Sequence, residues 1–155
     1  MKILLGSDSN GYKLKENVKA YLQELGHTVV DIGVDGSDQP DLYPDIAHDL
    51  GVRVARGETD RGILICGTGI GMAMVANKVP GVRAACAHDP YSAERARKSN
   101  DAQIITFGAQ IVGASLVQVL IDHWLISEFA GGRSTPKVKR INDLDDQYRK
   151  ELALP

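Results

Sequence analysis

Short apolar segments rich in β-branched residues alternate along this chain with longer segments in which apolar residues recur at helical spacing. The short segments predict five strands, over residues 2–5, 28–32, 62–65, 82–87 and 103–107. Their hydrophobic runs are nearly continuous, which is typical of parallel strands with both faces covered. Because strands and helices alternate, we expect an α/β fold of three layers, with a Rossmann-like sheet of five parallel strands between two layers of helices.

The longer segments predict helices over residues 12–25, 44–56, 71–78, 90–98 and 114–129. The first is representative, because Leu14, Val18 and Leu22 lie on one stripe and Gly26 follows as a natural stop. The pattern contains no internal repeat and no break between domains. We therefore expect a single domain over residues 1–155.

The segment after residue 130 differs from the rest of the chain. Residues 131–140 predict a loop rich in glycine and positive charge, and residues 142–152 predict an extra C-terminal helix. The apolar residues of that helix are Leu144, Tyr148 and Leu152. A helix this polar buries little against its own domain. It either packs on a partner subunit or lies solvated at the surface, and the sequence leaves both open.

Composition narrows the classes of function. The chain has 155 residues and a formal net charge of −2, which argues against a general nucleic-acid or anionic-membrane binder. No apolar run approaches the ~20 residues that span a bilayer, and no signal peptide is recognisable. Two cysteines are too few for a disulfide scaffold, and the four histidines lack the spacing of metal ligands. We expect a cytoplasmic protein with reduced thiols, no metal, and no nucleic-acid or membrane partner.

A glycine loop, residues 67–71 (GTGIG), follows the third predicted strand. Glycines allow close approach of the backbone, and the next helix points free N–H groups at the loop, which favours an anion such as a phosphate, a carboxylate or an enediolate. Dinucleotide binding is an alternative, because Asp89 ends the next strand where a ribose-binding acid would stand. However, Met72 replaces the third glycine of that fingerprint, and two strand–helix units precede the loop. A P-loop is excluded, because its motif does not occur.

The two cysteines differ in position. Cys66 ends the strand that enters the glycine loop, where the positive end of the next helix favours the thiolate over the thiol. A thiolate there can attack a carbonyl or remove an acidic proton next to one. Nucleophilic catalysis normally needs a neighbouring histidine, and His88 is the one placed to be near. Cys86 lies inside the run 82–87, where we expect a buried structural cysteine.

Three blocks of sequence carry a resemblance to a known family. They are GILICGTGIGMAMVANKVPGVRAA at residues 62–85, PYSAERARKSNDAQIITFGA at residues 90–109 and FAGGR at residues 129–133. Over nearly its full length the chain resembles the ribose-5-phosphate isomerase B and galactose-6-phosphate isomerase family of sugar-phosphate isomerases. The resemblance implies aldose–ketose isomerisation of a sugar phosphate without a cofactor. It also implies a homodimer or a dimer of dimers, with active sites at the subunit interface.

The resemblance further implies roles for individual residues. Cys66 would be the general base that moves a proton between C1 and C2 of the open-chain sugar, through a cis-enediolate. The amides of residues 67–71 would stabilise the enediolate, and Thr68 would assist at the substrate's oxygens. The implied substrate-binding residues are Asp8, Ser9, Tyr43, Gly67, Gly69, Ile70, Gly71, Ser99 and Asn100, and the implied phosphate-binding residues are Arg133 and Lys137. Structural alternatives stay open, since such residues can also cap or end a helix, pack beside a proline, or be solvated.

The chain departs from the family pattern at several positions. Ser9 stands for the histidine of the family's Asp-His-x-Gly, Ser99 for the histidine that opens the sugar ring, and Gln110 for a common arginine. Some members use, instead of the cysteine, a glutamate one helical turn into the glycine loop. Met72 stands there, so the chain belongs to the cysteine type.

The loss of the ring-opening histidine bears on the substrate, because serine is no acid–base catalyst near neutral pH. Ribose 5-phosphate closes a five-membered ring through its free O4, whereas a tetrose 4-phosphate has O4 blocked and needs no ring opening. The chain also resembles a family branch with serine at both positions that acts on such substrates. We therefore expect D-erythrulose 4-phosphate and D-erythrose 4-phosphate to be favoured over ribulose and ribose 5-phosphates. A replacement of the histidine by His88, a weakly held phosphate and an unphosphorylated sugar stay open.

Two other classes of function remain as alternatives. The first is a non-catalytic or partner-dependent sugar-phosphate-binding subunit, because some relatives work as paired unlike chains. The second is a dinucleotide-binding oxidoreductase, on the strength of the imperfect glycine fingerprint.

Overall fold

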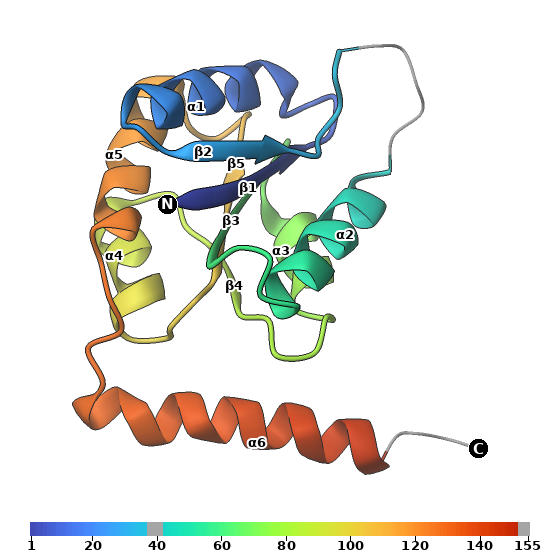
Figure 1. Ribbon diagram of the computed structural model, residues 1–155, viewed down its shortest axis with the longest axis vertical. Coiled ribbons are helices and arrows are strands. Elements are labelled where there is room, and N and C mark those ends of the chain that lie inside the picture. The colour runs from blue at the N-terminus through green and yellow to red at the C-terminus, as the bar shows by residue number, and fades with distance from the viewer. Residues whose placement is uncertain (37–41, 152–155) are drawn as a thin grey trace.

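The computed structural model describes residues 1–36 and 42–151 of the chain (Figure 1). Within these residues the strands are β1 (Lys2–Ser7), β2 (Thr28–Asp31), β3 (Arg61–Cys66), β4 (Ala84–Cys86) and β5 (Ile104–Gly108). All pairings are parallel, in the order β2-β1-β3-β5-β4. The predicted α/β fold around a parallel sheet is confirmed.

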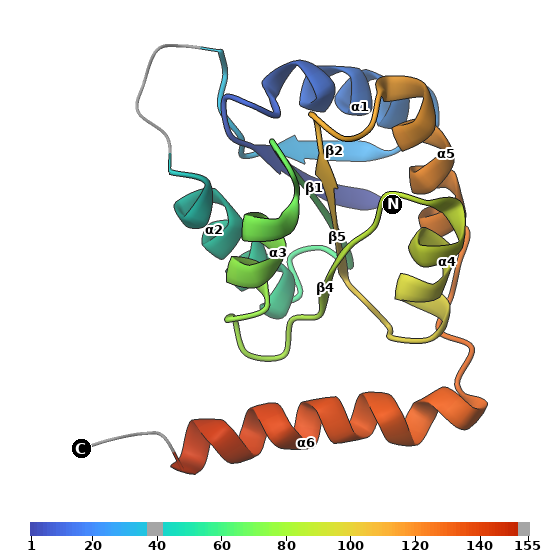
Figure 2. The ribbon, with the colours of Figure 1, turned by 180° about the vertical axis from the view of Figure 1, so that it is seen from behind.

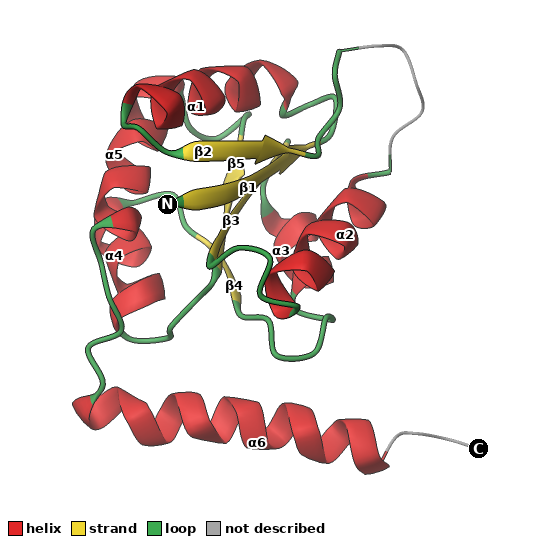
Figure 3. Ribbon diagram, in the orientation of Figure 1, coloured by secondary structure: helices red, strands yellow, loops and turns green. Residues whose placement is uncertain are grey.

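Helices cover both faces of this sheet. They are α1 (Tyr12–Glu24), α2 (Tyr43–Ala55), α3 (Ile70–Ala76), α4 (Pro90–Lys98) and α5 (Ala114–Leu125), and α6 (Thr135–Glu151) follows them. One core lies between the sheet and α1, α4 and α5, and the other lies between the sheet and α2 and α3 (Figure 3). Side chains alternate along each strand, so Ile3 and Leu5 enter the first core while Leu4 enters the second. This burial on both faces explains the continuous hydrophobic runs of the strands.

The edge strand β4 is shorter than the predicted 82–87, and neighbouring side chains explain where it begins. The Asn77 Oδ1 atom accepts the N–H of Ala84 (2.9 Å), and its Nδ2 donates to the Ala84 carbonyl (2.8 Å). The Gln103 Oε1 atom accepts the N–H of Arg83 (2.8 Å). Gln103 thus takes the Arg83 N–H and Asn77 covers the outer edge of Ala84. Arg83 joins the ladder only through its carbonyl, which accepts the Ile104 N–H (3.3 Å), and residue pairing begins at Ala84.

Helix α5 ends at Leu125 and not at residue 129 as predicted. The buried guanidinium of Arg61 donates to the carbonyls of Trp124 (3.3 Å) and Ser127 (3.0 Å). The Ser127 hydroxyl donates to the carbonyl of His123 (2.6 Å). These donors satisfy carbonyls that an extended helix would have bonded itself, so the chain leaves the helix here.

The predicted loop over residues 131–140 is wrong. Residues Gly132–Ser134 form a 3₁₀ turn, and α6 begins at Thr135. Pro136 is the second residue of this helix, a position where a missing N–H removes no helical hydrogen bond. Glycine and proline therefore start a helix here rather than break one. Residue 152, the predicted end of the helix, lies outside the described residues.

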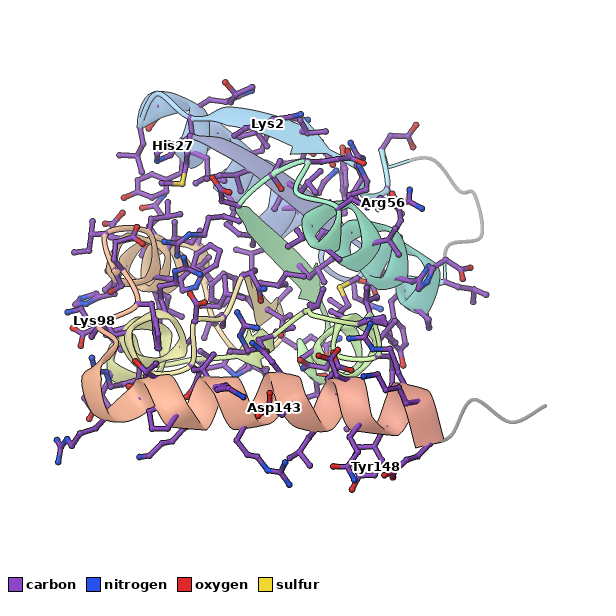
Figure 4. All side chains as sticks on the ribbon, turned by 60° about the horizontal axis from the view of Figure 1, so that its bottom comes forward. Lys2, His27, Arg56, Lys98, Asp143 and Tyr148 are labelled. Carbon is purple, nitrogen blue, oxygen red and sulfur yellow. The ribbon has the colours of Figure 1, made fainter. Side chains whose placement is uncertain are left out.

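Helix α6 lies apart from the two helical layers, across one end of the domain (Figures 1 and 2). Asp145 accepts the N–H of Gly81 (2.7 Å), and Asn142 accepts from the Arg83 guanidinium (2.9 Å). Among the described residues of the helix, Val138 alone is buried, and Tyr148 points away from the domain (Figure 4). No helix in the described ranges is long and apolar enough to cross a membrane.

Candidate active site

A cavity of about 290 Å³ opens at the carboxyl ends of β1 and β3. Its lining residues are Asp8, Asn10, Tyr43, Cys66, Gly67, Thr68, Gly71 and Gln110. They come from the loop after β1, the start of α2, the segment that joins β3 to α3, and the loop after β5. This edge is where open parallel sheets bind their ligands, because the connecting loops converge there.

Cys66 is the last residue of β3 and is only 6% exposed. Its side chain belongs to the core beneath α2 and α3, and it also lines the cavity. The Cys66 Sγ atom accepts the N–H of Gly69 over 3.1 Å. A hydrogen bond donated to sulfur stabilises the thiolate relative to the thiol. The sulfur thus faces both the glycine loop and the cavity.

Glycine is required at two positions of the loop for different reasons. Gly69 has a φ of 78°, and a Cβ there would lie 2.8 Å from the carbonyl carbon of Phe107. At Gly71 a Cβ would lie 2.7 Å from the aromatic ring of Tyr43. The loop therefore rests directly on the end of β5 and on the start of α2, with no space for side chains between them.

Asp8 and Tyr43 each have a structural contact as well as a place in the cavity wall. The Asp8 Oδ1 atom accepts the N–H of Gly11 (3.0 Å), which fixes the turn into α1. Tyr43 is 40% exposed and packs on Gly71. The structural and the functional interpretations of these residues are therefore compatible. Ser9 is exposed and does not belong to the lining residues.

Thr68 and Ile70 differ in their relation to the cavity. Thr68 lines it, and its Oγ1 atom accepts the N–H of Ile70 at 3.4 Å. The Ile70 side chain is 52% exposed and does not line the cavity. Of the loop amides, those of Gly69 and Ile70 thus already have side-chain partners, in Cys66 and Thr68 respectively.

Four of the sequence-predicted residues lie far from this cavity in the same chain. Ser99 and Asn100 follow α4, which runs back from the carboxyl edge of the sheet to its amino edge. There the Asn100 carbonyl accepts from the Arg83 side chain, just before β4 (3.1 Å). Arg133 lies in the 3₁₀ turn and Lys137 in the first turns of α6, both exposed. A single chain therefore brings together only part of the predicted set.

Cys86, at the end of β4, and His88 and Asp89, just after it, differ from what the sequence predicts. Cys86 is exposed and not buried, because β4 is the edge strand and the Cys86 side chain lies at its end. Partial burial against the glycine loop nevertheless raises the pKa of the Cys86 thiol. His88 does not line the cavity, and its Nε2 atom accepts the N–H of Gly108 (2.9 Å). Asp89 caps α4 by accepting the N–H of Ser92 (2.8 Å), and hydrogen bonding from Ser92 lowers the pKa of Asp89.

The role of Asp89 weakens the dinucleotide alternative, since the expected ribose-binding acid is committed to a helix terminus. Within residues 1–36 and 42–151, no group of three or more His, Cys, Asp or Glu side chains is placed to hold a metal ion.

Sequence reasoning missed Asn10 and Gln110 as residues of the cavity wall. Asn10 could have been found, because it lies in a loop after a strand, as Asp8 does. Gln110 stands out in the sequence only as a departure from the family. Its side chain lies within about 3.5 Å of the position that a Cβ of Gly67 would take.

Comparison with known proteins adds to this geometry. The family model described as Ribose/Galactose Isomerase matches residues 3–141. The chain is 48% identical to a D-erythrulose-4-phosphate isomerase of Pectobacterium atrosepticum, over 96% of this chain and 98% of that protein. It is 50% identical to a ribose-5-P isomerase B of Listeria innocua, over 96% of this chain and all of that protein. Among solved structures, ribose-5-phosphate isomerase B of Clostridium thermocellum superposes with a TM-score of 0.91 at 43% identity, covering 96% and 99% of the two chains.

Proposed function

The chain belongs to the ribose/galactose isomerase family and is a sugar-phosphate isomerase, and we propose that Cys66 is its base and a four-carbon sugar phosphate its substrate. The observation that carries the proposal is the position of the Cys66 sulfur, in the cavity wall and within hydrogen-bond distance of the Gly69 amide.

In the proposed reaction the Cys66 thiolate removes a proton from C1 of the open-chain ketose. The electron pair left on C1 forms the C1–C2 double bond, and negative charge moves to the C2 oxygen as a cis-enediolate. The thiol then returns the proton to C2, and the proton on O1 passes to the negatively charged C2 oxygen, which leaves the carbonyl at C1 and the hydroxyl at C2 of the aldose. One group serves as base and then as acid, so the sulfur ends each cycle as it began.

The enediolate needs donors that are already in place. Because the Gly69 N–H is directed at sulfur, we assign enediolate stabilisation to the amides of Gly67, Thr68 and Gly71 rather than to the whole loop. Loss of one such donor typically costs about 10²–10³-fold in kcat. Asp8 and Tyr43, in the opposite part of the wall, are assigned to the substrate hydroxyls.

The proposed four-carbon substrate follows from what the chain lacks. Ser9 and Ser99 stand at the two positions where family members carry histidine, and the Nε2 atom of His88 already accepts the N–H of Gly108. No acid for ring opening is therefore assigned. A tetrose 4-phosphate is acyclic and needs none, and the similarity to an isomerase of D-erythrulose 4-phosphate supports this choice.

We assign the missing part of the site to a second copy of the chain. Ser99, Asn100, Arg133 and Lys137 are exposed or half-buried and lie away from the cavity of their own chain. Apolar side chains are exposed beside the cavity, on the start of α2 and along α3: Leu42 (67%), Ile70 (52%) and Met74 (63%). A partner that covers them would bring its own basic residues to the substrate phosphate.

Complementation tests this assignment. Cys66→Ala and Asn100→Ala homodimers are each expected to be inactive or nearly so, and mixing them after partial unfolding is expected to restore activity. Restoration requires that the two residues serve one site from different chains. Two variants that stay inactive after verified subunit exchange would contradict it.

A substrate panel tests the proposed reaction. The purified chain alone is expected to isomerise D-erythrulose 4-phosphate, with a kcat/KM at least about tenfold above that for D-ribulose 5-phosphate, a difference of about 1.4 kcal/mol in the barrier. A preference for the pentulose would overturn the substrate. No turnover by the single chain would favour a partner-dependent subunit, and a nicotinamide-fluorescence titration would detect a dinucleotide site.

A further inference from the structure

We infer that His88 is a positioning residue of the active site, which acts through Gly108 on the glycine loop. The inference rests on the proposed function, because it concerns the loop to which we assign enediolate stabilisation. His88 itself does not line the cavity.

The imidazole replaces a backbone acceptor where the edge strand stops. The Ala87 N–H donates to the Thr106 carbonyl (3.3 Å), as in a parallel ladder. The next β5 amide on that side, that of Gly108, would find a carbonyl of the neighbouring strand if the ladder continued. It donates instead to the Nε2 atom of His88 over 2.9 Å. The imidazole ring therefore takes the place of a backbone carbonyl as the acceptor for the last amide of β5.

Gly108 in turn supports the glycine loop from below. A Cβ at Gly108 would lie 2.7 Å from the backbone of Thr68. The residues after Gly108 bond the loop directly, since the Ala109 N–H donates to the Cys66 carbonyl (2.8 Å) and the Gln110 N–H to the Gly67 carbonyl (3.0 Å). Close packing leaves no slack between these segments, so a displacement of Gly108 is passed on to the loop amides.

The proton of the neutral ring lies on Nδ1, because Nε2 accepts a hydrogen bond. Cys86 and Asp89 are titratable neighbours of the ring: the Cys86 sulfur lies 4.0 Å from Nε2, and Asp89 caps the start of α4. Burial raises the pKa of the Cys86 thiol, so that neighbour is uncharged at neutral pH. The glycine loop and the last residues of β5 carry no titratable side chain besides Cys66. Protonation of His88 would place an N–H against the Gly108 N–H and break the bond.

Three substitutions of His88 distinguish the loss of its hydrogen-bond acceptor from the loss of its side-chain volume. His88→Ala removes the acceptor, His88→Gln places an amide oxygen near the position of Nε2, and His88→Asn carries the same amide one methylene short of it. We expect kcat to fall about tenfold in His88→Ala and His88→Asn, less than removal of an oxyanion donor costs. KM is expected to stay within about twofold, because Asp8 and Tyr43 are untouched. His88→Gln is expected to restore kcat to within about twofold of the unsubstituted protein.

Nitrogen–proton NMR of Gly108 tests the hydrogen bond without any substrate. Its amide resonance is expected to shift when His88→Ala removes the acceptor, and to stay close to its unsubstituted position in His88→Gln. This readout holds even if the protein fails to isomerise the proposed sugar phosphates, so the two proposals fail separately. An unchanged kcat in His88→Ala, a His88→Gln variant as slow as His88→Ala, or a Gly108 resonance that ignores His88 would each overturn the inference.

Discussion

Cys66 and Cys86 lie on the same face of one sheet and both contact Gly69, yet their hydrogen bonds run in opposite directions. The Cys66 sulfur accepts the N–H of Gly69 (3.1 Å). The Cys86 thiol donates to the carbonyl of Thr68 (3.7 Å). An N–H stabilises a thiolate, whereas a carbonyl stabilises a protonated thiol.

Place in the sheet separates the two residues further. Cys66 ends a central strand and borders a cavity, while Cys86 ends the edge strand and borders solvent. The comparison teaches that the chemistry of a cysteine depends on which backbone group meets the sulfur as well as on its burial, since the buried thiol is the one that accepts an N–H.

Substitution of each cysteine by alanine tests the difference between the two thiols, and here we expect the largest effect. Cys66→Ala removes the proposed base, and turnover of the tetrulose phosphate is expected to fall by about 10²–10⁴-fold, the range for a general base. Cys86→Ala is the matched control, and its kcat is expected to stay within about threefold of the unsubstituted protein. Circular dichroism should show both variants folded. Equal losses in the two variants would remove the distinction between the thiols.

A smaller effect is expected when the residue shared by both thiols is changed. In Gly69→Ala the left-handed backbone costs about 1–2 kcal/mol of unfolding free energy, and the methyl group pressed against Phe107 adds about 1–3 kcal/mol. The shift moves the N–H that meets Cys66, so kcat is expected to fall about 10²-fold as well.

Gly57→Ala is the control for this change. Gly57 has a φ of 75°, close to that of Gly69, but a Cβ there would meet no atom of the described residues within 4 Å. Gly57→Ala should therefore carry the backbone cost alone and leave kcat unchanged. Denaturant unfolding of both variants measures the difference, and equal losses of stability would refute the close contact at Gly69.

The smallest expected effect is on the pH dependence of Cys86 alkylation. Because partial burial raises the pKa of Cys86, its thiolate forms only above the ordinary range of a free thiol, about 8.5. Alkylation of Cys86 by iodoacetamide, followed by mass spectrometry in the Cys66→Ala variant, is expected to reach half its maximal rate above that pH. A midpoint at or below it would mean that Cys86 is activated.

Most of the strands and helices could be predicted from the sequence, because their patterns involve residues close together in the chain. Apolar runs and helical spacing depend on neighbouring residues, and they place the strands, the helices and Cys66 at a strand end. The exposure of Cys86 could not be read in this way, because an apolar run does not reveal that its strand lies at the edge of the sheet. The predicted start of α6 was wrong because a proline such as Pro136 fits the first turn of a helix as well as a loop, so its presence does not decide between them.

In the candidate site too, the residues predicted correctly are those whose place depends on neighbouring sequence, and the others depend on contacts between distant residues. Asp8, Cys66 and the glycine loop follow from strand ends and chain order. The role of His88 depends on a hydrogen bond to a residue twenty positions away, which no spacing rule contains. Ser99, Asn100, Arg133 and Lys137 are recognisable as chemistry-bearing residues, but one sequence does not tell which copy of the chain they serve.

Transfer of hydrogen from solvent tests most directly whether Cys66 moves the proton. In deuterium oxide the unsubstituted protein is expected to place solvent deuterium on C1 or C2 of the sugar phosphate, followed by NMR, and Cys66→Ala is expected to place none above the rate without protein. Exchange by Cys66→Ala at a rate close to that of the unsubstituted protein would contradict the assignment of the base.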